Sequence, residues 1–393
     1  MPNSPRVLLI LKKNNMKHIL AALVALAVTA GCAVQEPHSV LELPASEGNS
    51  RNSEGDFIEL RDGRILFAYS KFTSGHGGDH DRCVIASRIS SDKGETWTSE
   101  DEVLAVNEAD PEGNVMSVSM LRLRDGRIAL FYLQKIPGDS EKIATRIMMK
   151  TSSDEGKNWS SETDCTAGMP LMYRVVNNGR VIRLSSGRIL IPVAWHKFHG
   201  TGDYDLDSDA ELYCLYSDDE GVSWKESEGF YIDDEDGSRV STQEPGVIEL
   251  KDGSVLMYIR ANTGYQWYAT SRDGGQTWDE QRHAPYTGPL APSTMHRLRD
   301  GRLLLVWNNH EGRPELTAIG ARTPLTLAVS SDEGASWGSV KDLESSYDPD
   351  NKMKYFYCYT SVLELKDRLL LSYCAEDGLR HLRITSVPLS WLK

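Results

Sequence analysis

The chain has 393 residues, with 43 lysines and arginines against 57 aspartates and glutamates, so its formal net charge is −14 at pH 7. A chain this acidic is a poor partner for nucleic acid and for anionic membrane surfaces. Any anionic ligand must therefore be bound by a local cluster of cations. The length alone would suggest two domains, but the internal repeats predict a single one.

The N-terminal segment predicts export. The stretch MKHILAALVALAVTAGC, which starts at Met16, has a basic start, an apolar run too short to span a membrane comfortably, and small residues before a cysteine. Its end resembles a lipoprotein processing site with Cys32 as the lipidated first residue, and plain signal cleavage is the alternative. We therefore expect a signal in residues 1–31 and one mature domain in residues 32–393. The mature protein is expected in the periplasm, on the outer membrane as a lipoprotein, or secreted.

Two short patterns recur along the rest of the chain. An octet, Ser-x-Asp-x-Gly-x-x-Trp, appears five times, from Ser90–Trp97 to Ser330–Trp337. A pair of β-rich runs joined by an Asp-Gly-type turn (strands A and B) appears six times. One octet lies between successive pairs, preceded by a strand C and followed by a strand D. Because no repeat has a helical period, the chain predicts an all-β, six-bladed β-propeller of four-stranded antiparallel blades.

The unequal counts predict how the ring closes. The last A–B pair is followed by one more strand, Leu382–Leu389, while His38–Pro44 precedes the first pair without a partner. If residues 38–44 supply strand D of the sixth blade, the N- and C-terminal segments share that last blade and no sheet edge stays open. The turn that would carry a sixth octet is then the break between the two chain ends.

The octets are expected to be structural. Their aspartate can accept hydrogen bonds from turn amides, their glycine suits a positive φ, and their tryptophan can pack on the blade. The octets lie on the face of the A–B and C–D turns, so the chemistry is expected on the opposite face. There the starts of the A strands and the ends of the B strands converge around the central channel.

The residues predicted at this channel mouth include arginines, carboxylates and tyrosines. Clustered arginines bind a carboxylate or a phosphate through paired hydrogen bonds, and neighbouring carboxylates suit acid–base work on a sugar bond. Each residue by itself is more often a solvated loop residue, so the prediction rests on their convergence. They include Glu54, Lys71, Ser117, Gln134, Arg174, His196, Gln243, Glu244, Arg260, Arg322, Tyr357 and Tyr359.

The stretches EPGVIELKDGSVLMYIR and RTPLTLAVSSDEGASW, together with the octets and the six blades, resemble the sialidase (neuraminidase) superfamily. The resemblance covers Ser53 to Leu392. It implies that Tyr359, in YTSVLEL, is the nucleophile and that Glu244 is its base. The acid/base residue is expected at Asp79 in the first B–C loop.

The resemblance also implies a substrate-binding set. Arg260 and Arg322 occupy the places of two arginines of the carboxylate-binding triad. The full expected set is Arg260, Arg322, Arg174, Gln243, Asp81 and His80, with Asp81 also the alternative to Asp79. A neutral tyrosine avoids the repulsion that an anionic nucleophile would meet at a sugar carrying a carboxylate. Asp79 would need a raised pKa to hold a proton for the leaving group. Tyr357 is expected to line the channel as aromatic packing.

Two positions depart from the family pattern. NSEGDFIEL stands where the first blade of sialidases carries an Arg-Ile-Pro motif, so the first arginine of the triad is missing. Cys374 stands where sialidases place a glutamate that braces this arginine. Both departures leave the identity of the sugar open. Arg174, Lys71 or His196 is expected to supply the replacement cation.

The sequence therefore predicts an exo-glycosidase of sialidase type that acts on terminal sialic acid or a related acidic sugar, retaining through a tyrosine nucleophile. Two alternatives stay open: a propeller enzyme acting on uronic-type sugars, and a non-catalytic propeller that binds glycans. The expected partners are sialylated or other acidic-sugar glycans, with no nucleic acid, and with a lipid anchor at Cys32 as one option. No motif predicts a cofactor or a metal, and a monomer is expected.

Overall fold

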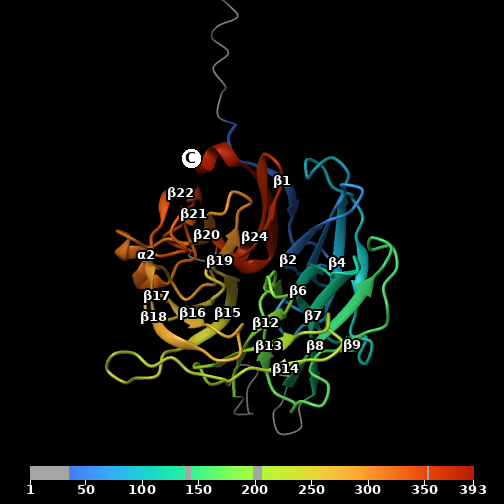
Figure 1. The fold of residues 1–393 in the computed structure, drawn as a ribbon. Coiled ribbons are helices and arrows are strands. Elements are labelled where there is room, and N and C mark those ends of the chain that lie inside the picture. Colours follow the sequence, from blue (N-terminus) through green and yellow to red (C-terminus); the bar gives the residue numbers. More distant parts are fainter. Residues whose placement is uncertain (1–34, 138–142, 198–205, 352–353) are drawn as a thin grey trace, which may run out of the picture. The chain divides into compact units, whose positions relative to one another are not determined.

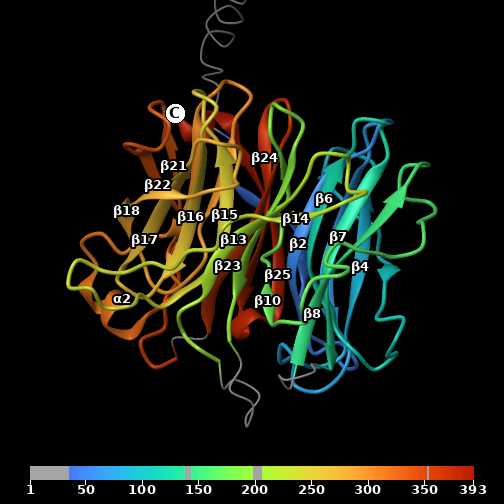
Figure 2. The ribbon, with the colours of Figure 1, turned by 60° about the horizontal axis from the view of Figure 1, so that its bottom comes forward.

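The computed structural model describes residues 35–137, 143–197, 206–351 and 354–393. The predicted signal in residues 1–31 and the predicted lipidation site at Cys32 lie outside the described residues. Residues 37–393 form one compact unit. Its strands form six antiparallel sheets arranged as the blades of a β-propeller, which confirms the predicted fold class (Figures 1 and 2).

The first three blades follow the chain order. The third blade differs from the others because its innermost strand is split into two short pieces, which pair separately with β12. The blades contain β2 (Arg51–Glu59), β3 (Ile65–Phe72), β4 (Cys83–Ser90) and β5 (Glu102–Ala105); β6 (Val115–Arg122), β7 (Ile128–Pro137), β8 (Ile143–Ser152) and β9 (Thr163–Asp164); and β10 (Arg174–Val175), β11 (Ile182–Arg183), β12 (Ile189–Trp195), β13 (Glu211–Ser217) and β14 (Lys225–Glu226).

The last three blades include the closure of the ring. They contain β15 (Thr242–Glu249), β16 (Val255–Ala261), β17 (Tyr265–Ser271) and β18 (Asp279–Thr287); β19 (Thr294–Arg297), β20 (Leu303–Asn308), β21 (Leu325–Ser330) and β22 (Gly338–Glu344); and β23 (Tyr355–Glu364), β24 (Arg368–Glu376), β25 (His381–Pro388) and β1 (His38–Leu43). The described helical elements are α2 (Pro314–Ile319) and the 3₁₀ turns η1 (Asp377–Leu379) and η2 (Leu389–Leu392). No helix in the described part of the chain is long and apolar enough to cross a membrane.

The shared last blade is confirmed. Strand β1 pairs antiparallel with β25, from His38 opposite Ser386 to Leu43 opposite Leu382. The blue N-terminal strand therefore lies beside the red C-terminal strands in Figure 1. Because β1 covers β25, the sixth blade reaches four strands and β25 has no unpaired edge.

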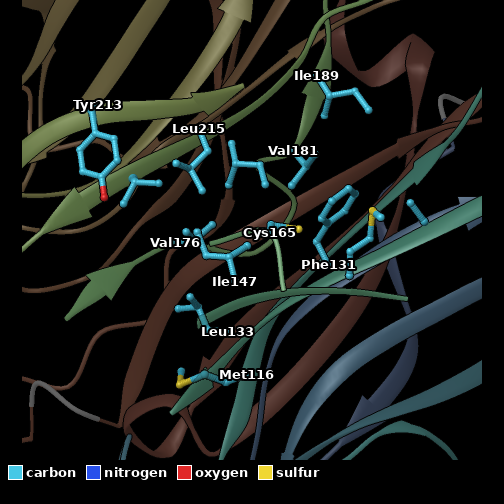
Figure 3. Packing of buried hydrophobic residues seen from close by; sticks show 14 of the residues in the cluster. Met116, Phe131, Leu133, Ile147, Cys165, Val176, Val181, Ile189, Tyr213 and Leu215 are labelled. Atoms are coloured by element: carbon cyan, nitrogen blue, oxygen red, sulfur yellow. The ribbon is translucent and has the colours of Figure 1, made fainter. Parts of the chain in front are cut away.

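The core is divided among the blade interfaces. Five of the six larger hydrophobic clusters of the described residues combine side chains from two adjacent blades. The sixth joins the second and third blades and also includes Phe72 and Cys83 of the first. Figure 3 shows the cluster between the second and third blades, where Phe131 and Ile147 pack near Ile189 and Leu215. Burial of this apolar surface favours the closed ring, since each blade covers a face of its neighbour.

The five octets have the predicted structural role. In the first one, Ser90 Oγ and the amide and hydroxyl of Thr96 donate hydrogen bonds of 2.6 to 2.9 Å to the carboxylate of Asp92. Gly94 has φ +87°, and Trp97 packs against the cluster between the sixth and first blades. The other octets repeat these contacts. The octet aspartates are therefore occupied by their own turns.

Candidate active site

Four A strands carry the same distortion where they approach the channel mouth. In each, a β-bulge interrupts the pairing with strand B, and the bulge contains a residue with positive φ. These residues are Glu54 (φ 53°), Ser117 (60°), Glu244 (36°) and Tyr359 (58°). A non-glycine residue in this region is strained, and such strain is concentrated at functional sites. All four side chains line one cavity of about 440 Å³.

Tyr359 and Glu244 meet in this cavity although they come from the sixth and fourth blades. The Tyr359 hydroxyl donates a hydrogen bond of 3.1 Å to Glu244 Oε1. The other oxygen of Glu244 accepts a hydrogen bond from Arg260 Nη1. Burial and the neighbouring Glu244 charge raise the pKa of Tyr359 well above its ordinary value. The resting tyrosine is therefore neutral, with a carboxylate placed to accept its proton.

Arg322 lies on the same side of the cavity. Its guanidinium stacks over the rings of Phe356, at 4.5 Å, and Tyr359, at 5.8 Å. Its Nη1 donates to Cys358 Sγ at 3.3 Å. Arg260 and Arg322 both line the cavity, so two predicted arginines present positive charge beside the tyrosine. A planar guanidinium is the group that suits bidentate binding of a carboxylate.

A second charged cluster surrounds Arg51. Its guanidinium is buried and donates to Asp79 Oδ1 at 2.6 Å and to Glu54 Oε1 at 3.0 Å. The other oxygen of Glu54 accepts a hydrogen bond of 2.7 Å from Ser117 Oγ. Burial raises the pKa of Glu54 to about 7 despite the opposing charge of Arg51.

Asp79 does not have the raised pKa expected from the sequence. Burial favours its neutral form, but the charges of Arg51 and Lys135 outweigh burial and lower the pKa of Asp79 below its ordinary value. Its side chain is 46% exposed, compared with 5% for Glu54. The exposed carboxyl of the pair is thus the ionised one, and the buried carboxyl holds the proton more tightly.

Lys135 is a further cation of the cavity lining. Its Nζ donates to the backbone oxygen of Asp79 and lies 3.3 Å from His80 Nδ1. Burial lowers the pKa of Lys135 to about 8. The ammonium lies 5.8 Å from the ring centre of Tyr173. This wall of the cavity therefore combines one lysine with an aromatic ring.

Of the other predicted site residues, Gln243 lies in the cavity lining, as predicted. Arg174 also reaches the lining, but its side chain is fully buried and its guanidinium binds Tyr213, Pro170 and Glu226. Asp81 is outside the lining, because its carboxylate accepts the amides of His76 and Gly78 within its own loop. His80 is outside the lining too, against Lys135.

The three candidates for the missing cation have different positions. The guanidinium of Arg174 is occupied as described above. Lys71 pairs with Asp101 at 2.6 Å and does not line the cavity. His196 does line it, with Nδ1 2.9 Å from the backbone oxygen of Asp207, and burial lowers its pKa. Lys135 also lines the cavity, and it was not among the cations expected from the sequence.

Tyr357 is not part of the channel lining, in contrast to the expectation. It is 1% exposed and packs edge-on against Tyr373 in the core between the fifth and sixth blades. The bulge that follows Cys358 changes the strand register, so that Tyr359 enters the cavity. Alternation along an undistorted strand would have placed both side chains on one face.

Arg51 was also missed by the sequence reading. It stands directly before NSEGDFIEL, the stretch found in place of the Arg-Ile-Pro motif, and its strand has a bulge between Ser53 and Gly55. The one feature of the sequence that could have indicated Arg51 is a charged residue within the first strand, which is otherwise β-rich.

Among the described residues, no group of three or more histidine, cysteine, aspartate and glutamate side chains is arranged to hold a metal ion.

Comparisons with known proteins agree with this architecture. The BNR repeat-like domain family matches residues 63–369 of the chain. A sialidase of Bacteroides fragilis is 25% identical over 264 residues, which make up 64% of this chain and 43% of that protein. The match therefore spans less than half the length of that relative.

Two solved structures share the fold. A protein of unknown function from Dyadobacter fermentans superposes with a TM-score of 0.68 at 19% identity, over 90% of this chain and all of that one. The NanB sialidase of Streptococcus pneumoniae superposes with a TM-score of 0.64 at 16% identity, over 91% of this chain and 71% of that chain. At these identities the likeness concerns the fold alone.

Proposed function

Since the chain belongs to the BNR repeat-like domain family of sialidase-type propellers, we propose that it is an exo-glycosidase that hydrolyses terminal sialic acid or a related acidic sugar from glycoconjugates. The observation that carries the proposal is the 3.1 Å contact between the Tyr359 hydroxyl and Glu244 in a cavity with two arginines. A propeller that only binds glycans has no need for a tyrosine and a carboxylate in hydrogen-bond contact. The name of the relative from Bacteroides fragilis, a sialidase, supports the same class.

The first half of the reaction forms a covalent intermediate. The oxygen of Tyr359 attacks the anomeric carbon, and its proton passes to Glu244. The bond from the anomeric carbon to the leaving group breaks, and a carboxylic acid of the cavity lining protonates the departing oxygen. A neutral nucleophile suits this step, because the substrate already carries a carboxylate close to the anomeric carbon.

The second half reverses these roles. Water attacks the anomeric carbon of the tyrosyl intermediate, and the carboxylate formed in the first half takes its proton. Tyr359 leaves and regains its proton from Glu244. The product keeps the anomeric configuration of the substrate, because two displacements have occurred at the same carbon. The proposed enzyme therefore retains the anomeric configuration of its substrate.

Arg260 and Arg322 bind the carboxylate of the sugar in this proposal. Both guanidinium groups line the cavity on the side of Tyr359. Arg322 is held by its stacking on Phe356, so little rotamer entropy is lost when it binds a carboxylate. The clamp thus places the anomeric carbon near the nucleophile.

A uronic-type sugar is the second candidate substrate. It is favoured by one observation: Arg51, the arginine of the first blade, is bound to Asp79 and Glu54 and is absent from the cavity lining. The carboxylate clamp then has two arginines. Such a clamp also fits a sugar whose carboxylate is placed differently from that of sialic acid.

A panel of acidic-sugar glycosides tests the proposal. We expect release of free sialic acid from sialyllactose, with turnover unchanged by a chelator. Activity on a uronic-acid glycoside and none on sialosides would establish the second candidate. Binding of these sugars with no release of any of them would leave only the glycan-binding alternative.

We also propose that the protein is exported and that Cys32 carries a lipid, as the N-terminal sequence predicts. Expression of the full chain and fractionation of the cells test this. Membrane association that is lost in Cys32→Ser supports the anchor. Release into the soluble exported fraction by the wild-type chain supports plain cleavage.

A further inference from the structure

One buried guanidinium, that of Arg51, contacts two carboxyls, Asp79 and Glu54. The groups that face Glu54 are Arg51 from its own strand, Asp79 from the loop after β3, the Cys83 thiol of β4, the Ser117 hydroxyl of β6, Lys135 of β7, Glu244 of β15 and the Cys374 thiol of β24. Of the two carboxyls that contact Arg51, Glu54 is 5% exposed and Asp79 is 46% exposed, so burial disfavours the ionised form of Glu54 more strongly.

The geometry decides which carboxyl carries a proton. Asp79 has the shorter contact with Arg51, 2.6 Å against 3.0 Å for Glu54, and it is far more exposed to water. The second oxygen of Glu54 accepts a hydrogen bond of 2.7 Å from the hydroxyl of Ser117. A hydroxyl can either donate to a carboxylate or accept from a carboxylic acid, so this contact tolerates a protonated Glu54. The proton therefore belongs to Glu54.

The position of Glu54 also matches that of the groups assigned to the reaction. It is the bulge residue of the first blade, as Glu244 and Tyr359 are the bulge residues of the fourth and sixth blades. All three line the same cavity. We propose that Glu54, rather than Asp79, is the carboxylic acid that protonates the leaving group. This inference rests on the proposed glycosidase function.

The chemical step balances with Glu54 as the acid. Its O–H bond breaks and the proton passes to the glycosidic oxygen, while the bond between that oxygen and the anomeric carbon breaks. Tyr359 forms its bond to the anomeric carbon and gives its proton to Glu244. The aglycone leaves as an alcohol, and the Glu54 carboxylate later takes a proton from the attacking water.

Asp79 becomes a positioning residue in this arrangement. Its ionised carboxylate fixes the guanidinium of Arg51 at 2.6 Å, and Arg51 in turn contacts Glu54. Arg51 is further held by its contact with the Phe72 ring, at 4.5 Å. Loss of Asp79 would leave Arg51 with Glu54 alone, which favours ionisation of Glu54 and removes its proton.

A series of leaving groups separates the two carboxyls. A nitrophenol leaves without a proton, whereas the sugar alcohol of sialyllactose needs one. We expect Glu54→Gln to lower kcat/KM on sialyllactose by about 100-fold to 10,000-fold, and to lower it by less than about tenfold on the nitrophenyl sialoside. Asp56→Asn is the matched control, because Asp56 is a buried carboxyl of the same strand with a pKa raised by burial to about 7, yet it does not line the cavity. It should leave the ratio of the two rates unchanged.

The pH profile gives a second readout. The acid must be protonated, so kcat/KM of the wild type on sialyllactose should fall as the pH rises through about 7, the pKa to which burial raises Glu54. Ser117→Ala removes a hydrogen bond that stabilises the ionised form and keeps the carboxyl. It should move this fall to higher pH, which tests Glu54 even if Glu54→Gln folds poorly.

The inference and the proposed function fail in different ways. If Asp79→Asn loses activity only on the poor leaving group while Glu54→Gln keeps it, Glu54 is not the acid and the glycosidase function stands. A pH profile of Ser117→Ala that coincides with that of the wild type also contradicts the role of Glu54. A wild-type protein that cleaves neither the sialosides nor any other acidic-sugar glycoside overturns the glycosidase function, and the role of Glu54 falls with it.

Discussion

The octet turns and the four bulges are both repeated along the chain, and both hold residues with positive φ. In the octets the sequence repeats together with the backbone: Lys93, Glu155, Glu220 and Glu333 have φ near 60°, each just before a glycine with positive φ. In the bulges the backbone repeats while the side chain changes, from Glu54 to Ser117, Glu244 and Tyr359. The repeated residues serve the fold, and the varied ones meet in one cavity.

The carboxyl groups of the two regions also differ in the direction of their pKa shifts. Each octet aspartate accepts hydrogen bonds from its own turn, and these lower the pKa of Asp154 and Asp332 to about 2. At the bulges, burial raises the pKa of Glu54 to about 7. A structural carboxylate that accepts hydrogen bonds stays ionised at neutral pH. An acid–base catalyst needs a pKa near the working pH, so that it can both give and take a proton. The comparison therefore assigns function by environment, since residue type alone does not separate the regions.

The largest effect is expected at the bulge of the sixth blade. Tyr359→Phe removes the oxygen that forms the covalent bond, so kcat should fall on the order of 1,000-fold or more. Tyr357→Phe is the control, because this neighbour is buried in the core between blades. Steady-state kinetics on sialyllactose compares the two. Near-full turnover by Tyr359→Phe would mean that water is activated directly and that the enzyme inverts.

A smaller loss is expected at the arginine beside this bulge. Arg322→Lys keeps one charge but loses the planar fork and the stacking on Phe356. We expect KM to rise and kcat to fall, with kcat/KM lower by about 10-fold to 100-fold. Michaelis profiles on the same substrate measure both constants. An unchanged KM would show that Arg322 does not bind the sugar carboxylate.

The first-blade bulge gives a prediction on stability. The folded state raises the pKa of Glu54 from 4.5 to about 7, so its protonated form is favoured by folding. This stabilisation is complete below pH 4.5 and is lost as the pH rises to about 7. Because glutamine cannot ionise, Glu54→Gln should gain stability relative to the wild type as the pH rises from 5 to 8, by about 2 to 3 kcal/mol. Urea unfolding at both pH values measures this, and a constant difference would contradict the raised pKa.

The smallest effect is expected in the octets. Asp273→Ala removes the acceptor of hydrogen bonds from Ser271, Gln276 and Thr277. It should cost about 1 kcal/mol of unfolding free energy, because the donors regain water at this partly exposed turn. The kcat of the variant should equal that of the wild type. A loss of kcat at unchanged stability would contradict the purely structural role of the octets.

The sequence predicts the ring and part of the site because their signals are local. Counting octets and hairpins predicts the sixth blade shared with β1, and the structure confirms it. The resemblance pairs Tyr359 with Glu244 as nucleophile and base, and their hydrogen bond of 3.1 Å agrees with that pairing. The ring is predictable because it needs only the repeat and the strand pattern.

The rest of the site depends on interactions between distant residues. Arg51 belongs to no motif of the sequence, and its contacts with Asp79 and Glu54 form only in the fold. The charge of Asp79 is set by Arg51 and Lys135, neither of which is close to it in sequence. For this reason the expected raised pKa of Asp79 is wrong, and Glu54 has it instead. Burial and charge balance are properties of the folded cavity, which a single strand does not encode.

The central claim is that the bulge residues form one glycoside-cleaving site with Tyr359 as nucleophile. A fluorinated acidic sugar with a good leaving group slows the second displacement and traps the covalent intermediate. Intact-mass measurement and peptide mapping of the trapped protein test the claim. We predict one added sugar, on Tyr359, and none in Tyr359→Phe. A sugar attached to another residue, or turnover of the fluorinated substrate with no adduct, would contradict the account.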